Sequence, residues 1–335
     1  MSAAPATPGR RLRQAALLPL HLLALASGAK SFRDNPLIGS RLLNRAGLHA
    51  ARVLLAHGVM RLRRLWFAAA LSREERHAFA RDGYFVRRDF LPPERFAALE
   101  RELRAERAAT RNEIQGDTLT RSTVLDNALL RQLPACRAVL RDPAYLRLAR
   151  YAAGRARVPF HWIQQLRRGV VEGAVDPQSV LHADTFHPTM KAWLFVDDVG
   201  AHNGAFTYVP GSHRLTRARL GWEYRQSLIG ADQPVYYAGR GSLRIEAAEL
   251  PGLGLPPPLQ LAVPRNTLVV ADTHGFHCRG PAPAGGERLE LFAISRTNPF
   301  NPLPGLPFAA LDWLDRAGLR VFLRLRERAR ARRST

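Results

Sequence analysis

Two histidines and an aspartate are spaced along this chain in a way that could hold a metal ion. His182-Ala183-Asp184 carries an imidazole and a carboxylate two residues apart. A β-strand presents alternate residues on one face, so both side chains can point at one ion. A second imidazole, from His277 or His274, would complete a two-histidine, one-carboxylate face and leave positions open. This ligand set suits ferrous iron that binds a cosubstrate and dioxygen.

An arginine follows the second histidine in the sequence. Arg288 comes eleven residues after His277, and a guanidinium is a planar fork of N–H donors that binds a carboxylate through two hydrogen bonds. We interpret Arg288 as the residue that holds a carboxylate of the cosubstrate. The tripeptide alone is weak evidence, because the chain contains 11 histidines and His182 could be a core residue. The metal-site hypothesis depends on the order of the motifs: the tripeptide, an Asn-Gly turn, a second histidine and then an arginine.

Short extended runs, broken by Gly, Pro and Asn, must position these side chains. The runs span residues 160–166, 191–196, 206–209, 267–271 and 289–294. His202-Asn203-Gly204 predicts a hairpin turn, because Asn-Gly readily adopts positive φ, with 206–209 as the return strand. Many short strands predict an antiparallel barrel or jelly roll, so we expect a mostly β core with flanking helices.

Composition and predicted secondary structure divide the chain into three parts. We expect an apolar, arginine-rich helical segment over residues 1–73, a catalytic domain over 74–300, and a basic amphipathic helix and tail over 301–335. Ser72 followed by Glu75 predicts a capped helix where the catalytic domain begins. Within that domain, residues 214–265 are longer than a hairpin needs, and we expect a lid or wall above the mouth of the barrel.

The basic residues of the chain concentrate at its two ends. The net charge is +22, from 50 Lys+Arg against 28 Asp+Glu. Residues 1–73 hold twelve basic residues and one acid, and residues 311–335 hold eight arginines and three acids. Such flanks predict attraction to anionic lipid, nucleic acid or an acidic partner. The alternative is a genome composition that places arginine wherever a solvated cation is tolerated.

Each end also carries apolar residues at helical spacing. The two stripes consist of Leu55, Val59, Leu62 and Trp66, and of Leu314, Val321 and Leu325. Such helices either lie in a membrane interface or pack on the catalytic domain. We expect peripheral contact with an anionic membrane. Nucleic acid is disfavoured as a partner, because the flanks lack the interleaved aromatics of a base-stacking surface.

The first residues imitate a secretory signal peptide without matching one well. An arginine cluster at residues 10–13 precedes an uncharged run over residues 14–29, but this run is short and contains a proline and a histidine. No uncharged run reaches the roughly 20 residues of a spanning helix. Cys136 and Cys278 are too few for a disulfide framework. We therefore expect a cytoplasmic protein.

Over about residues 74–300 the chain resembles the phytanoyl-CoA dioxygenase family of iron(II)/2-oxoglutarate oxygenases. The matching residues are Gly83-Tyr84-Phe85-Val86, Phe90-Leu91, His182-Ala183-Asp184, Asn203-Gly204-Ala205-Phe206, Val209-Pro210-Gly211-Ser212-His213, His277 and Arg288. The resemblance implies a double-stranded β-helix, that is, a jelly roll. It also implies iron(II) held by His182, Asp184 and His277. The interval of eleven to Arg288 is the one the family uses, which favours His277 over His274.

The resemblance further implies 2-oxoglutarate and dioxygen as cosubstrates. Arg288 would pair with the distal carboxylate of 2-oxoglutarate. Trp193 would line the cosubstrate pocket, with a structural core tryptophan as the alternative, and Gln164 would supply a polar contact. The chain departs from the family at Arg279, where a serine that bonds the same carboxylate is common.

The reaction implied by the resemblance is hydroxylation of an unactivated carbon, coupled to conversion of 2-oxoglutarate to succinate and carbon dioxide. Asp184 favours hydroxylation, because related halogenases have a small residue there that lets halide bind. We expect the substrate to be a lipid, an acyl thioester or another hydrophobic small molecule. Two alternatives stay open: a nucleic-acid oxygenase that uses the basic flanks, and a non-catalytic scaffold member of the family.

Overall fold

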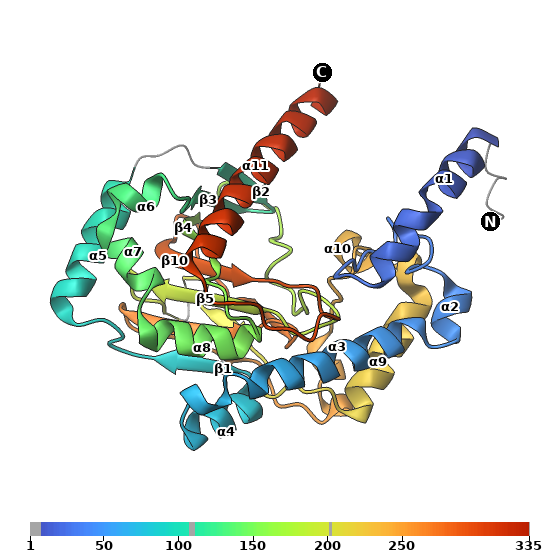
Figure 1. Cartoon of the computed structure of the whole chain (residues 1–335), viewed down its shortest axis with the longest axis horizontal. Coiled ribbons are helices and arrows are strands. Elements are labelled where there is room, and N and C mark those ends of the chain that lie inside the picture. The colour runs from blue at the N-terminus through green and yellow to red at the C-terminus, as the bar shows by residue number, and fades with distance from the viewer. Residues whose placement is uncertain (1–7, 107–110, 201–202, 335) are drawn as a thin grey trace.

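The computed structural model describes residues 8–106, 111–200 and 203–334 of the chain (Figure 1). Its core is made of antiparallel strands: β1 (Tyr84–Arg87), β2 (Arg111–Gln115), β3 (Thr118–Val124), β4 (Phe160–Arg167), β5 (Met190–Phe195), β6 (Phe206–Tyr208), β7 (Leu259–Gln260), β8 (Thr267–Asp272), β9 (His277–Arg279) and β10 (Glu287–Ser295). Seven strands form one sheet in the order β1-β8-β5-β10-β4-β3-β2, and three form a second in the order β7-β6-β9. The predicted mostly β, jelly-roll core with flanking helices is confirmed.

The predicted hairpin at Asn203-Gly204 is wrong, although the turn exists. Gly204 has the expected positive φ of 81°, and the Asn203 side chain accepts from Gly200 N and donates to Asp198 O. However, β5 pairs with β8 and β10, whereas β6 pairs with β7 and β9. The turn therefore carries the chain from one sheet to the other, as a jelly roll requires. His202 of this motif lies outside the described residues.

Helices cover the outer face of the large sheet (Figure 1). They are α4 (Arg73–Asp82), α5 (Pro93–Ala105), α6 (Leu129–Gln132), α7 (Pro134–Leu140) and α8 (Pro143–Ala153). The predicted capping box is present at the start of α4, where Ser72 and Glu75 bond each other's backbone N–H. Apolar residues of these helices, such as Phe79 and Leu99, share one buried core with Leu194 and Val270 of the sheet. Each such side chain contributes about 1.5–3 kcal/mol by leaving water.

The N-terminal segment contains α1 (Pro8–Leu25), α2 (Arg41–Arg45), α3 (Leu48–Leu65) and the short η1 (Ala68–Ala70). Helix α3 packs on the catalytic domain, but mostly through residues other than the predicted stripe. Val59 is buried, whereas Leu55, Leu62 and Trp66 are 55–70% exposed. The buried face instead contains polar residues such as Arg52, whose guanidinium donates to the carbonyls of residues 25, 27 and 29. These hydrogen bonds compensate for the burial of the Arg52 guanidinium.

The segment 214–265 and the N-terminal segment form one wall beside the barrel. The segment 214–265 contains α9 (Arg217–Ile229), η2 (Gly230–Asp232), α10 (Tyr236–Gly239), η3 (Ala247–Glu249) and η4 (Pro251–Leu253). Trp222, Leu243 and Ile245 from this segment share a core with Phe32 and Ile38. We call residues 26–40, between α1 and α2, the strap, because they cross this wall.

The C-terminal helix, α11 (Ala309–Ser334), is anchored near its start. Asp312 is buried and accepts from Val158 N, and Asp315 pairs with Arg155 and Arg157. Arg320, further along, pairs with Asp126, and the remainder of the helix projects from the body on the same side as α1 (Figure 1). The predicted stripe of Leu314, Val321 and Leu325 is 55–57% exposed. In the described part of the chain, no helix is both long and apolar enough to cross a membrane.

Candidate metal centre

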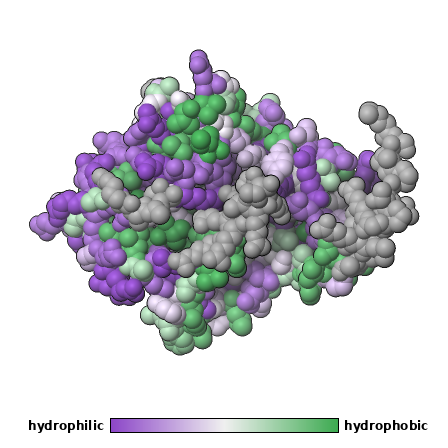
Figure 2. Space-filling view, turned by 90° about the horizontal axis from the view of Figure 1, so that it is seen from above, coloured by the Kyte–Doolittle hydropathy of each residue, from purple (hydrophilic) through white to green (hydrophobic). Residues whose placement is uncertain are grey.

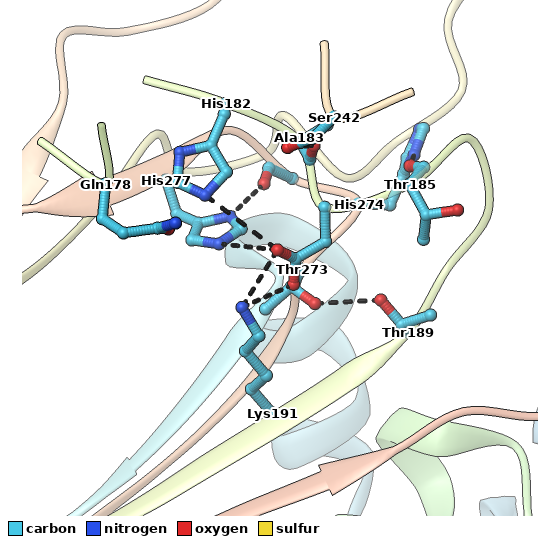
Figure 3. A network of polar contacts seen from close by, with 12 residues as sticks. Gln178, His182, Ala183, Thr185, Thr189, Lys191, Ser242, Thr273, His274 and His277 are labelled. Atoms are coloured by element: carbon cyan, nitrogen blue, oxygen red, sulfur yellow. Dashed lines mark hydrogen bonds and ion pairs between the residues drawn. The ribbon is translucent and has the colours of Figure 1, made fainter. Parts of the chain in front are cut away.

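The three predicted metal ligands lie together at the edge of the small sheet. His182 and His277 exchange backbone N–H···O hydrogen bonds of 2.9 Å, which places both imidazoles on one face. The loop after His182 is held by a hydrogen bond from Asp184 N to Thr273 O. The candidate ligand atoms of the three residues all lie within 4.8 Å of one another, and all three side chains are buried (Figure 3). Among the described residues, no other such group of His, Cys, Asp or Glu could hold a metal.

Both imidazoles are held in the tautomer that a metal requires. Nδ1 of His182 lies 2.8 Å from Val180 O, and Nδ1 of His277 lies 2.9 Å from Gly275 O. A carbonyl can only accept, so each Nδ1 carries the proton and each Nε2 presents its lone pair. The Nε2 atoms lie 4.0 Å and 3.8 Å from Asp184 Oδ1, and that of His277 has no hydrogen-bond partner among the described residues.

The charges of these groups also fit a metal. Burial lowers the pKa of His182 well below its usual value and that of His277 to about 4, so both rings are neutral at pH 7, as metal ligands must be. Burial alone would raise the pKa of Asp184, but the positive charges of Lys191 and Arg296 hold it well below its usual range. The donor set therefore fits a divalent metal ion.

Lys191 contacts the carboxylate of the triad directly. Its Nζ lies 2.7 Å from Asp184 Oδ2 and 3.0 Å from Oδ1. Lys191 and Trp193 are two residues apart on β5, so both side chains point into the barrel. The ion pair orients the carboxylate so that Oδ1 faces the histidines.

The structure separates His274 from the triad. Its Nδ1 bonds Thr185 O at 3.0 Å, and its ring packs edge-on against His57 at 4.5 Å. His277, rather than His274, therefore lies beside Asp184. The preference for His277 had come from the spacing of a family motif, and local sequence could not have decided between the two.

A pocket of about 240 Å³ adjoins the triad and contains all three predicted cosubstrate residues, Arg288, Trp193 and Gln164. Arg288 donates from Nε to Glu290 Oε2 at 2.7 Å and from Nη1 to Gly204 O. No acceptor among the described residues contacts its Nη2. The Arg288 fork is thus fixed on one side and available to a carboxylate on the other.

Trp193 and Gln164 line this pocket in different ways. The Trp193 ring packs on Phe206, with centroids 4.4 Å apart, and so forms an apolar wall that excludes water. Gln164 Nε2 donates to Ser122 Oγ at 3.2 Å. Its neighbour Gln165 does not line the pocket and instead contacts Glu287. The register of β4 therefore assigns the pocket position to Gln164.

Arg279, which stands where the family often has serine, is neither solvent-facing nor free. It lines the pocket and its Nη1 bonds the buried Asp176 at 2.6 Å. Arg168 lies 3.5 Å from the same carboxylate. Arg279 thus forms a paired, fixed part of the pocket wall.

A larger groove, of about 1380 Å³, continues from this pocket along the inner face of the large sheet. The two cavities share Glu113, Ser122, Gln164 and Phe292. The apolar lining of the groove comprises Val124, Leu129, Leu133, Trp162, Phe292, Ile294, Leu319, Phe322 and Leu323. The last three belong to α11, so the C-terminal helix forms one wall of a groove that leads to the triad.

Sequence reasoning missed the cations around Asp184. They are Lys30, Lys191, Arg244 and Arg296, which all interact electrostatically with this carboxylate. Burial, with Arg296, Lys191 and Arg244, lowers the pKa of Lys30 to about 8, against the opposing effect of Asp184. One signal was available in the sequence: among 50 Lys+Arg, only residues 30 and 191 are lysines.

Comparisons with known proteins agree with the resemblance seen in the sequence. A family model described as phytanoyl-CoA dioxygenase (PhyH) matches residues 79–241, which include His182 and Asp184 but not His277. No curated protein matches the chain.

Several solved structures are similar to this chain. The non-heme alpha ketoglutarate dependent epimerase SnoN from nogalamycin biosynthesis is 20% identical, with a TM-score of 0.45 over 66% of this chain and 81% of that one. HygX from Streptomyces hygroscopicus, with nickel and 2-oxoglutarate bound, is 18% identical, with a TM-score of 0.44 over 67% and 86%. The carbocyclase SnoK, also from nogalamycin biosynthesis, is 19% identical, with a TM-score of 0.42 over 68% and 84%.

Proposed function

We propose that this chain, whose core carries a domain of the phytanoyl-CoA dioxygenase family, is an iron(II)- and 2-oxoglutarate-dependent oxygenase that hydroxylates an unactivated carbon. The observation that carries the proposal is the triad of His182, Asp184 and His277, with two neutral imidazoles and one carboxylate converging on one point. Three ligands on one face leave positions for a bidentate cosubstrate and dioxygen. Iron bound there would supply oxidation by dioxygen, coupled to decarboxylation of 2-oxoglutarate.

The residues around the triad prepare the site for this chemistry. Carbonyls at Val180 and Gly275 fix the two imidazole rings, and Lys191 fixes the carboxylate. Arg288 would hold the distal carboxylate of 2-oxoglutarate through Nη2, because Nε and Nη1 each already bond an acceptor. Trp193 shields the pocket from water, which strengthens each of these electrostatic contacts.

The groove beside the pocket supports a hydrophobic substrate, such as a lipid or an acyl thioester. Aromatic and aliphatic residues, among them Trp162, Phe292 and Ile294, line it next to the pocket. An apolar chain placed there would leave water while one of its carbons lies near the triad.

Anaerobic titration of the purified protein with iron(II) and 2-oxoglutarate tests the proposal. We expect a metal-to-ligand charge-transfer absorption band that needs both components, and consumption of 2-oxoglutarate to succinate on admission of air. Absence of the band at saturating iron and cosubstrate would contradict the enzyme function and favour a non-catalytic scaffold.

We further propose that the protein works in the cytoplasm at an anionic membrane surface. Helices α1 and α11 project on the same side of the body (Figure 1). Exposed apolar residues on them include Leu20, Leu23, Leu314, Val321 and Leu325. Seen from this side, the mostly hydrophilic surface contains apolar patches (Figure 2). Basic, amphipathic helices of this kind bind anionic lipid interfaces.

Sedimentation with vesicles tests this placement. We expect binding to vesicles that contain phosphatidylserine, weaker binding at high salt, and little binding to neutral phosphatidylcholine vesicles. An oligonucleotide measured under the same conditions serves as the competing ligand. Binding to the oligonucleotide but not to the vesicles would contradict membrane docking and favour the nucleic-acid alternative.

A further inference from the structure

The lysines of this chain occur only at its metal centre. Lys30 and Lys191 are the two lysines among 50 Lys+Arg, and both contact Asp184. Lys191 pairs with the carboxylate, and Lys30 donates from Nζ to the backbone oxygen. A lysine presents a compact charge with three donors, whereas an arginine presents a wide planar fork. Chance placement does not explain why both exceptions to an arginine-rich composition meet at one residue.

The strap (residues 26–40) places Lys30 by close backbone packing against the segment 214–265. Arg33 N donates to Gly239 O. Gly241 has a positive φ of 82°, and a Cβ at this position would clash with Lys30 O. Phe32, next to Arg33, is buried in the core of the wall. The position of Lys30 is therefore fixed by the fold, although it is 154 residues away from Asp184 in the sequence.

Two arginines lie near Lys30 on the same side of the triad. Arg244 forms an antiparallel bridge with His182 and donates to Ser242 Oγ at 3.2 Å. Ser242 Oγ in turn donates to Ala183 O, next to the backbone oxygen that Lys30 contacts, so Arg244 lies near Lys30. Arg296 follows the last residue of β10 and lines the larger groove. Just beyond it, Asn298 donates to Ala26 O and so holds this part of the chain against the strap.

None of these three cations has an acidic partner. Within the described ranges, no carboxylate forms an ion pair with Lys30, Arg244 or Arg296. Lys30 contacts the backbone oxygen of Asp184, and the carboxylate of Asp184 is paired with Lys191. Asp176, which also acts on Arg244, is paired with Arg279. The positive charge of these three residues is therefore not balanced by an ion pair within the described ranges.

The cosubstrate cannot neutralise Arg296. Arg288 and Arg296 are eight residues apart on and just beyond β10, which corresponds to roughly 25 Å of extended strand. A five-carbon diacid held by Arg288 is too short to reach Arg296. A negative charge bound at Arg296 must come from another ligand.

We propose that Lys30, Arg244 and Arg296 bind an anionic group of the substrate, a carboxylate or a phosphate, while the apolar part of the substrate lies in the adjoining groove. This inference rests on the proposed function of the same site and narrows its substrate class to anionic amphiphiles. Arg296, which belongs to both the groove and the cluster, connects the two parts of this binding site. We call the three residues the anion cluster.

Binding of three matched probes tests the anion cluster. Dodecanoate, dodecyl phosphate and dodecanol share one apolar chain and differ in the head group. Each is titrated calorimetrically into the anaerobic complex of protein, iron(II) and 2-oxoglutarate, where no turnover occurs. We expect both anions to bind more tightly than the alcohol. The tighter of the two anions then identifies the head group, carboxylate or phosphate.

Charge-removing variants assign the effect to the cluster. We expect Lys30→Met and Arg244→Met each to weaken binding of the preferred anion about tenfold or more, as for a lost charge-assisted hydrogen bond, and to leave dodecanol within about twofold. Arg217→Met, which removes an exposed arginine from α9, should change neither. Equal weakening of anion and alcohol, or no weakening of either, would overturn the proposal.

Two further measurements keep the result interpretable. Thermal denaturation shows whether Lys30→Met is folded. If it is not, Arg244→Met alone tests the proposal, because no hydrogen bond or ion pair joins Arg244 to Asp184. The charge-transfer band is recorded for each variant. A normal band without selective loss of anion binding refutes the anion cluster alone, whereas absence of the band in the wild-type protein refutes the proposed oxygenase function.

Discussion

The positive charges on the two sides of the metal centre are arranged in opposite ways. We call the side of Arg279, Arg288 and Lys191 the β10 end, and the side of Lys30, Arg244 and Arg296 the strap end. At the β10 end, each cation has an acid within hydrogen-bond distance: Arg288 with Glu290 at 2.7 Å, Arg279 with Asp176 at 2.6 Å, and Lys191 with Asp184 at 2.7 Å. At the strap end, Lys30, Arg244 and Arg296 have none among the described residues. The ion pairs of the β10 end hold its side chains in fixed positions. The cations of the strap end have no such pair, so a bound anion could neutralise their charge.

This difference has a consequence for specificity. A paired cation presents little net charge, so the β10 end selects its ligand mainly by the direction of the remaining donors. An unpaired cation attracts any anion that fits, so the strap end selects by charge and by the shape of the groove. On this proposal the cosubstrate binds at the β10 end and the anionic group of the substrate binds at the strap end.

We expect the largest loss of binding on substitution of Asp184, which contacts Lys191 of the β10 end and Lys30 of the strap end. Asp184→Ala removes the carboxylate that the triad shares with Lys191, and we expect metal affinity to fall by more than about 100-fold, because even the loss of outer-sphere contacts costs 10- to 100-fold. Metal titration measures this. Asp232→Ala, at an exposed aspartate of η2, is the control. Unchanged metal affinity in Asp184→Ala would remove Asp184 from the ligand set.

The next effect isolates the β10 end. Arg288→Met should weaken 2-oxoglutarate binding about 10- to 100-fold, as expected for loss of a charge-assisted hydrogen bond to a carboxylate. Metal affinity and binding of dodecanoate should stay within about twofold. Charge-transfer titration and calorimetry report the two ligands separately. If dodecanoate weakens as much as 2-oxoglutarate, the two ends do not bind different ligands.

An acidic side chain introduced beside Arg244 should form an ion pair there, like the ion pairs of the β10 end. Ser242→Asp places a carboxylate beside Arg244, whose Nη1 already contacts Ser242 Oγ. We expect dodecanoate to bind about five- to tenfold more weakly, because the new pair neutralises one cation of the cluster. Ser242→Asn, which adds similar volume without charge, is the matched control. An equal effect of the two substitutions would show that bulk, rather than charge, is responsible.

Removing an acid from the β10 end should have the smallest effect. Glu290→Gln keeps an acceptor for Arg288 Nε but removes a negative charge from the pocket. We expect 2-oxoglutarate to bind about three- to fivefold more tightly, corresponding to about 1 kcal/mol of relieved repulsion. Weaker binding would mean that the charge of Glu290 is needed to orient Arg288.

The sequence predicted the parts of the site that lie in one motif or at a family spacing. His182 and Asp184 are adjacent enough for strand geometry to unite them, and the strands near them were found from short apolar runs with turn punctuation. Gln164 and Trp193 lie on those strands and line the pocket as expected. Their roles toward iron and cosubstrate remain predictions.

The sequence could not predict contacts that depend on tertiary packing. Lys30 reaches Asp184 only because the strap crosses the segment 214–265, and no local pattern encodes that crossing. The hairpin at Asn203-Gly204 failed for a related reason, since turn chemistry does not say which sheet the next strand joins. On α3, hydrogen bonds satisfy buried residues such as Arg52, so the hydrophobic stripe did not mark the buried face.

The most direct test of the account is a crystal structure of the protein grown under argon with iron(II), 2-oxoglutarate and dodecanoate. The account predicts iron between His182, Asp184 and His277, with 2-oxoglutarate extending toward Arg288. It predicts the dodecanoate carboxylate against Lys30 and Arg244, with its chain in the groove beneath α11. A dodecanoate carboxylate bound at Arg288, or a chain outside the groove, would contradict the division of the pocket into two differently charged ends.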